Sequence, residues 1–174
     1  MPFAKKPQVF SAKINELTLG TGDKAAILGG QNVFNLYSFD APIANRPKIG
    51  IDVSDDPEQP SEGLKEFYAG CGTLAQRAKK AAELEDVDFV CIRFDLADPN
   101  GANKSIEDCV ADAKAVAEAV DKPIVVAGCK NSEKDADLFG KVSEALQGKN
   151  ILVLSAKEEN YKGVAAGAGM AYGQ

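Results

Sequence analysis

Short apolar runs alternate with amphipathic segments along most of this chain, and no other feature restricts its fold as strongly. Runs typical of β-strands cover residues 48–53, 88–94, 124–128 and 151–155. Helical spacing of apolar residues fills the intervals 61–85, 105–121 and 132–148, the first of them divided at Gly70-Cys71-Gly72. Strands and helices alternate at intervals of roughly 30 to 40 residues. This alternation predicts right-handed βαβ units and a parallel sheet.

Two predicted helices carry their own boundary signals. Ser105 and Asp108 have the spacing of a capping box, with Asp in place of the preferred Glu, and Ser132 opens the next helix. That second helix should end before Gly148, a residue type that favours the turn after a helix.

An N-terminal β-hairpin precedes these units. Residues 9–18 and 24–37 show broken alternation of apolar and polar residues on either side of Gly20-Thr21-Gly22-Asp23, which has the composition of a turn. We therefore expect a hairpin extension over residues 1–45 and the main domain over residues 46–174.

The βα pattern is shared by doubly wound sheets and by (β/α)8 barrels. No Gly-x-Gly-x-x-Gly motif follows any predicted strand, which weakens the dinucleotide-binding alternative and favours the barrel. About four βα units supply only half of such a barrel. The predicted fold class is therefore α/β, with parallel βα units of TIM-barrel type forming about half a barrel. The chain is a fragment, a half-barrel that pairs with another chain, or an open sheet.

Charge and hydropathy exclude several classes of partner. The net charge of -6 predicts repulsion from nucleic acid and from anionic lipid. No run of about 18 apolar residues is present, so no membrane helix is expected. Without a signal-peptide core near the N-terminus, we expect a cytoplasmic protein.

The chain contains no histidine, and its four cysteines form no Cys-x-x-Cys pair. A metal site is therefore not expected, and the cysteines are interpreted as structural. Without imidazole, chemistry must come from carboxylates, Lys, Tyr or Cys, or from a cofactor that the protein holds. We assign no catalytic residue.

Polar residues follow each predicted strand, where the loops of a parallel barrel converge. These candidates are Asp52, Ser54, Asp55, Asp95, Asp98, Asn100, Lys130, Asn131, Ser155, Glu158, Asn160 and Tyr161. Several of them also have an ordinary structural explanation. Residues 98–101 have the composition of a turn, the acids suit solvated loops or helix N-termini, and Tyr161 suits an interface.

Several segments, in matching order through nearly the whole chain, are similar to one family. They are VFSAKINELTLGTGDK at 9–24, LGGQNV at 28–33, DFVCIRF at 88–94, ADPNG at 97–101, VAGC at 126–129, SAKEENY at 155–161 and GAGMAY at 167–172. Together they resemble the N-terminal half of the small (delta) subunit of the corrinoid iron–sulfur protein of the CO dehydrogenase/acetyl-CoA synthase system.

The resemblance implies a TIM barrel about twice this length and a heterodimer. A large subunit would carry the iron–sulfur cluster, and the corrinoid (cobalamin) would lie between that subunit and this barrel. Cobalt(I) would take a methyl group from a methylated pterin and deliver it to acetyl-CoA synthase, so a methyltransferase and acetyl-CoA synthase are further expected partners.

Hydrogen-bonding side chains at the strand ends suit the amide groups at a corrinoid rim. The expected cofactor-binding residues are Asp95, Asp98, Asn100, Asn131, Asn160 and Tyr161. Two alternatives remain. The barrel itself binds the methylated pterin, with Asp98 and Asn100 against the pterin ring, or the chain is a truncated scaffold that binds no ligand.

Overall fold

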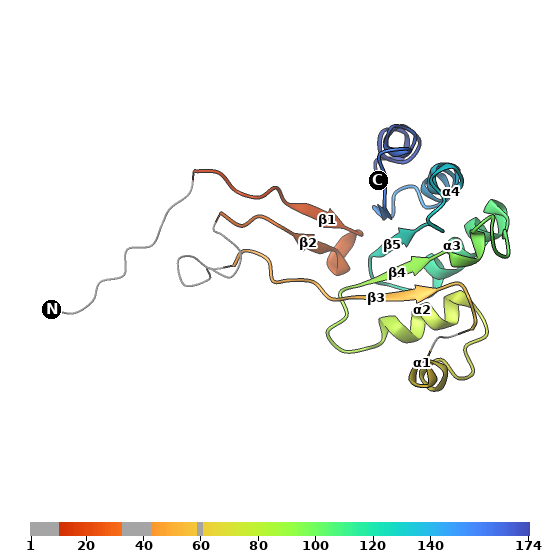
Figure 1. Cartoon of the computed structure of the whole chain (residues 1–174). Coiled ribbons are helices and arrows are strands. Elements are labelled where there is room, and N and C mark those ends of the chain that lie inside the picture. The colour runs from red at the N-terminus through yellow and green to blue at the C-terminus, as the bar shows by residue number, and fades with distance from the viewer. Residues whose placement is uncertain (1–10, 33–42, 59–60) are drawn as a thin grey trace.

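A four-stranded parallel sheet forms the centre of the molecule (Figure 1). The structure, a computed structural model, describes residues 11–32, 43–58 and 61–174. The strands are β3 (Gly50–Ser54), β4 (Phe89–Arg93), β5 (Ile124–Ala127) and β6 (Leu152–Leu154), and they lie in that order in the sheet. All four predicted core strands are confirmed, each shorter than its predicted range or shifted from it by one or two residues.

Helices connect the strands. They are α1 (Glu62–Phe67), α2 (Leu74–Ala82), α3 (Ile106–Ala119), α4 (Ser132–Ala145) and α5 (Tyr161–Val164). Helix α2 packs on α3, and α3 packs on α4. A strand order that follows the sequence, with neighbouring crossover helices in contact, is the arrangement of a barrel wall, whereas a doubly wound sheet reverses its order at a switch point. The predicted α/β class is confirmed: over the residues that the structure describes, the sheet is not closed, which is consistent with a partial barrel.

One face of the sheet and the helices enclose the main core. Val53, Val90, Ile92 and Val126 project from three strands and are almost fully buried together with Phe139 of α4. Each such side chain contributes about 1.5 to 3 kcal/mol of hydrophobic free energy. This burial explains why residues that alternate along each strand point toward the helices.

The hairpin packs on the opposite face of the sheet. Strands β1 (Leu17–Leu19) and β2 (Ala26–Leu28) are antiparallel, and Leu19 and Ala26 form a small cluster with Val125. The predicted hairpin is confirmed over a shorter length, and residues 9–10 and 33–37 of its predicted strands lie outside the described residues. Gly20 and Gly22 have φ values of 73° and 67° in the turn, a conformation that glycine adopts without strain.

Helix boundaries follow the local sequence. Thr73 and Gln76 form a complete capping box at the start of α2, after Gly70 has ended the preceding turn with a φ of 82°. At the start of α3, the Asp108 backbone N–H donates to the Ser105 hydroxyl at 3.1 Å, as predicted.

The Gly- and Ala-rich C-terminal segment was not predicted to be helical. In the structure, α5 continues into a π-helical segment (Ala165–Met170) that packs on α4. The ideal Cβ position at Gly167 lies 3.9 Å from the Gly140 Cα, so two glycines permit this close approach. Small residues give little periodic hydrophobic signal, and that weakness explains why the sequence did not indicate the helix.

Candidate functional site

Polar side chains gather at the carboxyl ends of β3 and β4, on the sheet face that points away from the helices. Ser54 and Arg93 are register partners, and Asp52 lies two residues earlier on the same face of β3. The Arg93 guanidinium donates to Asp52 and, through Nε, to the Asp95 carboxylate at 2.6 Å. The Ser54 hydroxyl also donates to Asp95, at 2.7 Å. One arginine therefore holds two partly exposed carboxylates in place.

The charge of Arg93 is stabilised by these contacts. Burial alone would lower the pKa of the Arg93 guanidinium, but the hydrogen bond to Asp95 and the charge of Asp52 outweigh it and raise the pKa. Each carboxylate in turn keeps a cationic donor. The cluster of Arg93, Asp52 and Asp95 can bind a polar ligand through the remaining lone pairs of its two carboxylates, without any proton transfer.

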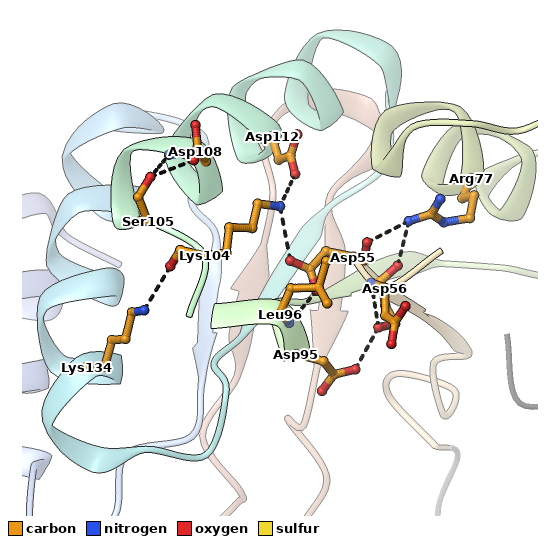
Figure 2. Close-up of polar contacts among 11 residues, drawn as sticks. Asp55, Asp56, Arg77, Asp95, Leu96, Lys104, Ser105, Asp108, Asp112 and Lys134 are labelled. Carbon is orange, nitrogen blue, oxygen red and sulfur yellow. Dashed lines mark hydrogen bonds and ion pairs between the residues drawn. The ribbon is translucent and has the colours of Figure 1, made fainter. Parts of the chain in front are cut away.

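A second cluster lies on the helix side of the same strand ends (Figure 2). The Asp55 side chain is fully buried, and it accepts from the Leu96 backbone N–H at 3.0 Å and from the Lys104 ammonium at 3.1 Å. Lys104 also donates to Asp112 of α3 at 2.5 Å. The cluster therefore fastens both ends of the β4–α3 loop to the end of β3.

Two further cations fix the backbone around this loop. Arg77 of α2 donates to the carbonyl oxygens of Ser54 and Asp55, both at 3.1 Å (Figure 2). The Lys134 ammonium of α4 donates to the Lys104 carbonyl at 2.8 Å. Burial lowers the pKa of Lys104, but its hydrogen bonds to Asp112 and Asp55 outweigh this effect and raise it.

The β4–α3 loop carries three of the six expected cofactor-binding residues. Asp95 belongs to the Arg93 cluster. The Asp98 carboxylate accepts from the backbone N–H and the side-chain amide of Asn100, at 2.9 and 3.2 Å, and the Asp98 carbonyl accepts from Gly101. Residues 98–101 thus form the turn that their composition indicates, and this turn leaves the Asn100 side chain exposed.

The other three of the six expected cofactor-binding residues lie on the β5–α4 and β6–α5 connections. Asn131 caps α4 by accepting from the Lys134 backbone N–H at 3.0 Å. Asn160 is buried, and its amide links the Lys157 backbone N–H to the Ser132 carbonyl, at 2.7 and 2.9 Å. Tyr161 begins α5 and is half exposed. The structure therefore gives the two asparagines structural roles and leaves Tyr161 accessible.

The sequence did not single out Arg93, Lys104, Asp112 or Lys134. A usable signal existed for Arg93, because it is the one cation within the apolar run at 88–94. Lys104 and Asp112 are separated from Asp55 by 49 residues or more along the chain. No local pattern connects residues so distant, so only the folded chain reveals the cluster.

The four cysteines are free; Cys109 and Cys129 are buried, and Cys71 and Cys91 are partly buried. Burial raises the pKa of Cys109 to about 12, and burial together with the charge of Asp52 raises the pKa of Cys91 to about 11. Cys129 donates to the Asp135 carboxylate through its backbone N–H and its thiol, at 2.7 and 3.2 Å. These contacts support the interpretation of the cysteines as structural.

Among residues 11–32, 43–58 and 61–174, no group of three or more Cys, Asp or Glu side chains is arranged to hold a metal ion. Within the same ranges, no helix is both long and apolar enough to cross a membrane.

Comparison with known proteins identifies the family. The delta subunit of the acetyl-CoA decarbonylase/synthase complex of Archaeoglobus fulgidus is 29% identical over 88% of this chain and 36% of its own length. The corresponding subunit of Methanothermobacter thermautotrophicus is 30% identical over 91% of this chain and 41% of its own. Delta subunit 1 of the complex from Methanosarcina thermophila is 30% identical over 79% of this chain and 31% of its own length. The chain thus spans about a third to two fifths of the length of these relatives. The sequence model of the CO dehydrogenase/acetyl-CoA synthase delta subunit family matches residues 16–173, and the chain belongs to that family.

Proposed function

We propose that this chain forms part of a delta subunit in an acetyl-CoA decarbonylase/synthase complex and helps to hold a corrinoid there. The observation that carries the proposal is the fixed β4–α3 loop at the carboxyl edge of the sheet. The buried Asp55 and Lys104 anchor this loop, and its tip presents the exposed Asn100 amide. A rigid scaffold that presents hydrogen-bonding loops suits the recognition of a large amide-bearing ligand.

The residues present fit such a ligand in part. Asn100 and Tyr161 are exposed: Asn100 offers its amide oxygen, since its NH2 group donates to Asp98, and Tyr161 offers a phenol. Asn131 and Asn160 use their side-chain oxygens within the fold, so we assign contact with the corrinoid to Asn100 and Tyr161 first. When bound, the cobalt of the corrinoid supplies the methyl-transfer chemistry. The residues of this chain would bind and orient the ring and exclude water from one of its faces.

A partner subunit completes this proposal. The iron–sulfur cluster would belong to the large subunit of the corrinoid protein, and the methyl group would pass from a methylated pterin to acetyl-CoA synthase. The relatives carry the name of a complex subunit, which supports assembly with other proteins.

Pterin binding by the barrel itself is the second candidate, through Asp98 and Asn100. It receives less support, because the Asp98 carboxylate is already bonded to both nitrogen groups of Asn100 within one turn. A scaffold that binds no ligand is the third candidate. The three differ in one respect: corrinoid retention needs the large subunit, pterin binding needs this barrel alone, and a scaffold shows neither.

The test is to mix the chain with a corrinoid iron–sulfur large subunit that carries its corrinoid, and to follow visible absorbance through gel filtration. We expect co-elution with the corrinoid retained. A double variant, Asn100→Ala with Tyr161→Ala, should weaken retention by about 5- to 160-fold, because each of the two lost hydrogen bonds contributes about 0.5 to 1.5 kcal/mol.

Lys24→Gln provides the matched control. Its ion pair with Asp121 is exposed and lies on the hairpin side, away from the β4–α3 loop. We expect this variant to retain the corrinoid as the unaltered chain does. Failure of the unaltered chain to associate with the large subunit would refute the proposal, and binding of a methylated pterin by the chain alone would favour the second candidate.

A further inference from the structure

A groove of about 550 Å³ runs along one side of α4. Helix α4 packs on α3 to one side and on the helix formed by α5 and the π-helical segment to the other (Figure 1). All three helices contribute to the lining. Leu138, Phe139 and Val142 of α4 belong to the core, whereas Ala136 and Gly140 line the groove. The groove therefore lies on the outer surface of the helical layer.

Small residues make up much of the lining. Ala136 and Gly140 belong to α4, Gly163 belongs to α5, and Gly167 belongs to the π-helical segment. Glycine leaves the backbone of a helix uncovered, so another polypeptide can approach this surface closely. The partly buried Tyr172 adds an apolar wall. The groove can therefore receive large apolar side chains from another molecule.

The charged side chains of the groove are mostly acidic. Glu107, Asp137 and Glu144 are exposed, and the lining contains one cation, Lys141. Lys141 bonds to Glu144 at 3.2 Å. Within the part of the chain that the structure describes, no cation is in ion-pair contact with Glu107 or Asp137. The groove therefore has a net negative charge, which attracts the lysines and arginines of a partner and repels an acidic surface.

The shape of the groove suits a helix. Its α4 residues run from Ala136 to Glu144, which corresponds to about 12 Å at about 1.5 Å per residue. Ala136, Gly140 and Glu144 recur every four residues, so they form one row along α4. A groove between parallel rows of helical residues accepts the apolar face of an amphipathic helix, which is a common mode of peptide recognition.

We propose that this groove docks a basic amphipathic helix of another protein. The apolar face of that helix packs against Ala136, Gly140 and Gly167, and the lysines or arginines beside this face pair with Glu107 and Asp137. No residue that lines the groove belongs to the proposed corrinoid site. Docking is therefore independent of corrinoid binding, and the two proposals can fail separately.

A second copy of the chain is a poorer occupant. Helices α3 and α4, which form this surface, contain eight acidic residues and three basic ones, and the whole chain has a net charge of -6. Two such surfaces repel each other, because like charges placed opposite each other across an interface oppose association.

The experiment uses a fluorescent peptide of about 18 residues, long enough to form a helix by itself. Leucines occupy one face of this peptide, and lysines and alanines occupy the rest. A counterpart has glutamate in place of every lysine. Fluorescence anisotropy measures binding to the whole chain, and nuclear magnetic resonance follows the amide signals of Gly140, Gly163 and Gly167. We expect the lysine peptide to bind with a Kd below about 100 μM, at least about 10-fold tighter than the glutamate peptide, and to shift these three signals.

Charge reversal locates the docking surface. The double variant Glu107→Lys with Asp137→Lys should weaken binding of the lysine peptide by about 10-fold or more, because repulsion replaces attraction. The matched control is Glu66→Lys with Glu118→Lys, which makes the same change in net charge at exposed positions outside the groove. It should weaken binding by no more than about 2-fold, since salt screens distant charges.

A third variant fills the groove. An ideal Cβ at Gly140 lies 3.7 Å from the Gly167 carbonyl oxygen, an ordinary contact, so the backbone accommodates a side chain there. Gly140→Leu should weaken binding by about 10-fold, because its side chain occupies the space of the docked helix. Circular dichroism checks that each variant keeps the fold.

Three results would overturn the proposal. In the first, the lysine peptide does not bind, or both peptides bind equally well. In the second, the groove variants and the control variant weaken binding equally, which assigns the attraction to the acidic surface as a whole. In the third, the chain alone dimerises and the signals of Gly140, Gly163 and Gly167 depend on its concentration, which assigns the groove to a second copy.

Discussion

Removal of the Asp55 carboxylate should destabilise the fold much more than removal of Asp112, although both bind Lys104. The Asp55 side chain is fully buried, whereas 37% of the Asp112 side chain reaches solvent. Asp55 also accepts the Leu96 backbone N–H, which begins the β4–α3 loop. The substitution Asp55→Ala therefore removes two hydrogen bonds, and the exposed loop loses its attachment to β3.

The expected magnitude follows from these contacts. The Leu96 N–H is partly buried, and leaving it without an acceptor costs at most the roughly 1 to 3 kcal/mol of a buried donor. Lys104 keeps Asp112 and is 18% exposed, so its loss of Asp55 costs less than the 3 to 5 kcal/mol or so of a broken, fully buried pair. We expect a total loss of about 3 kcal/mol for Asp55→Ala. Asp55→Asn should lose about 1 to 2 kcal/mol, because its amide oxygen still accepts from Leu96.

Urea denaturation followed by far-ultraviolet circular dichroism measures these losses. The matched control is Asp112→Ala, for which we expect a loss of at most about 1 kcal/mol, the range of exposed pairs. Equal losses for Asp55→Ala and Asp112→Ala, or a loss below about 1 kcal/mol for Asp55→Ala, would refute the reasoning. Either result would show that burial of the Asp55 side chain does not set the contribution of its contacts to the free energy of unfolding.

Three further predictions concern neighbouring features. Gly128→Ala should cost about 2 to 4 kcal/mol in urea denaturation, because its new Cβ would lie 2.2 Å from the Asp135 carboxylate; a loss below 1 kcal/mol or so would contradict this. The raised pKa of Lys104 stabilises the fold below a pH of about 10.4, and this contribution is lost as the pH rises through the folded-state pKa. Lys104→Met should remove that alkaline loss, seen as a flatter dependence of unfolding free energy on pH above about 10. The Cys109 thiol should react with Ellman's reagent at neutral pH only after denaturation, and rapid reaction in the native state would contradict its burial.

The sequence predicted the architecture well because its signals are local. The apolar runs at β3, β4, β5 and β6 and the helical spacing between them fixed the element types, and Ser105 fixed the start of α3. The C-terminal helix was missed because alanine and glycine give no apolar stripe. The hairpin was found, but its paired length was overestimated, since alternation of residue types continues past the last backbone pair.

The candidate site was predicted less completely. The gathering of polar side chains at the carboxyl ends of the strands followed from topology, and the turn at 98–101 followed from composition. The hydrogen-bond partners of individual residues did not follow. Asn131 and Asn160 were expected at the cofactor, and the structure shows their side chains bonded within the fold.

The sequence by itself therefore determined the α/β class, the hairpin and the membership in the delta subunit family, because each depends on residues that are neighbours in the chain. Only the tertiary structure decided which charges meet and which edges stay open. Asp55 meets Lys104, and Arg93 lies between Asp52 and Asp95, because strands and helices from distant segments pack at one end of the sheet. Electrostatic contacts depend on distances in space, and these distances are set only when burial of the core has folded the chain.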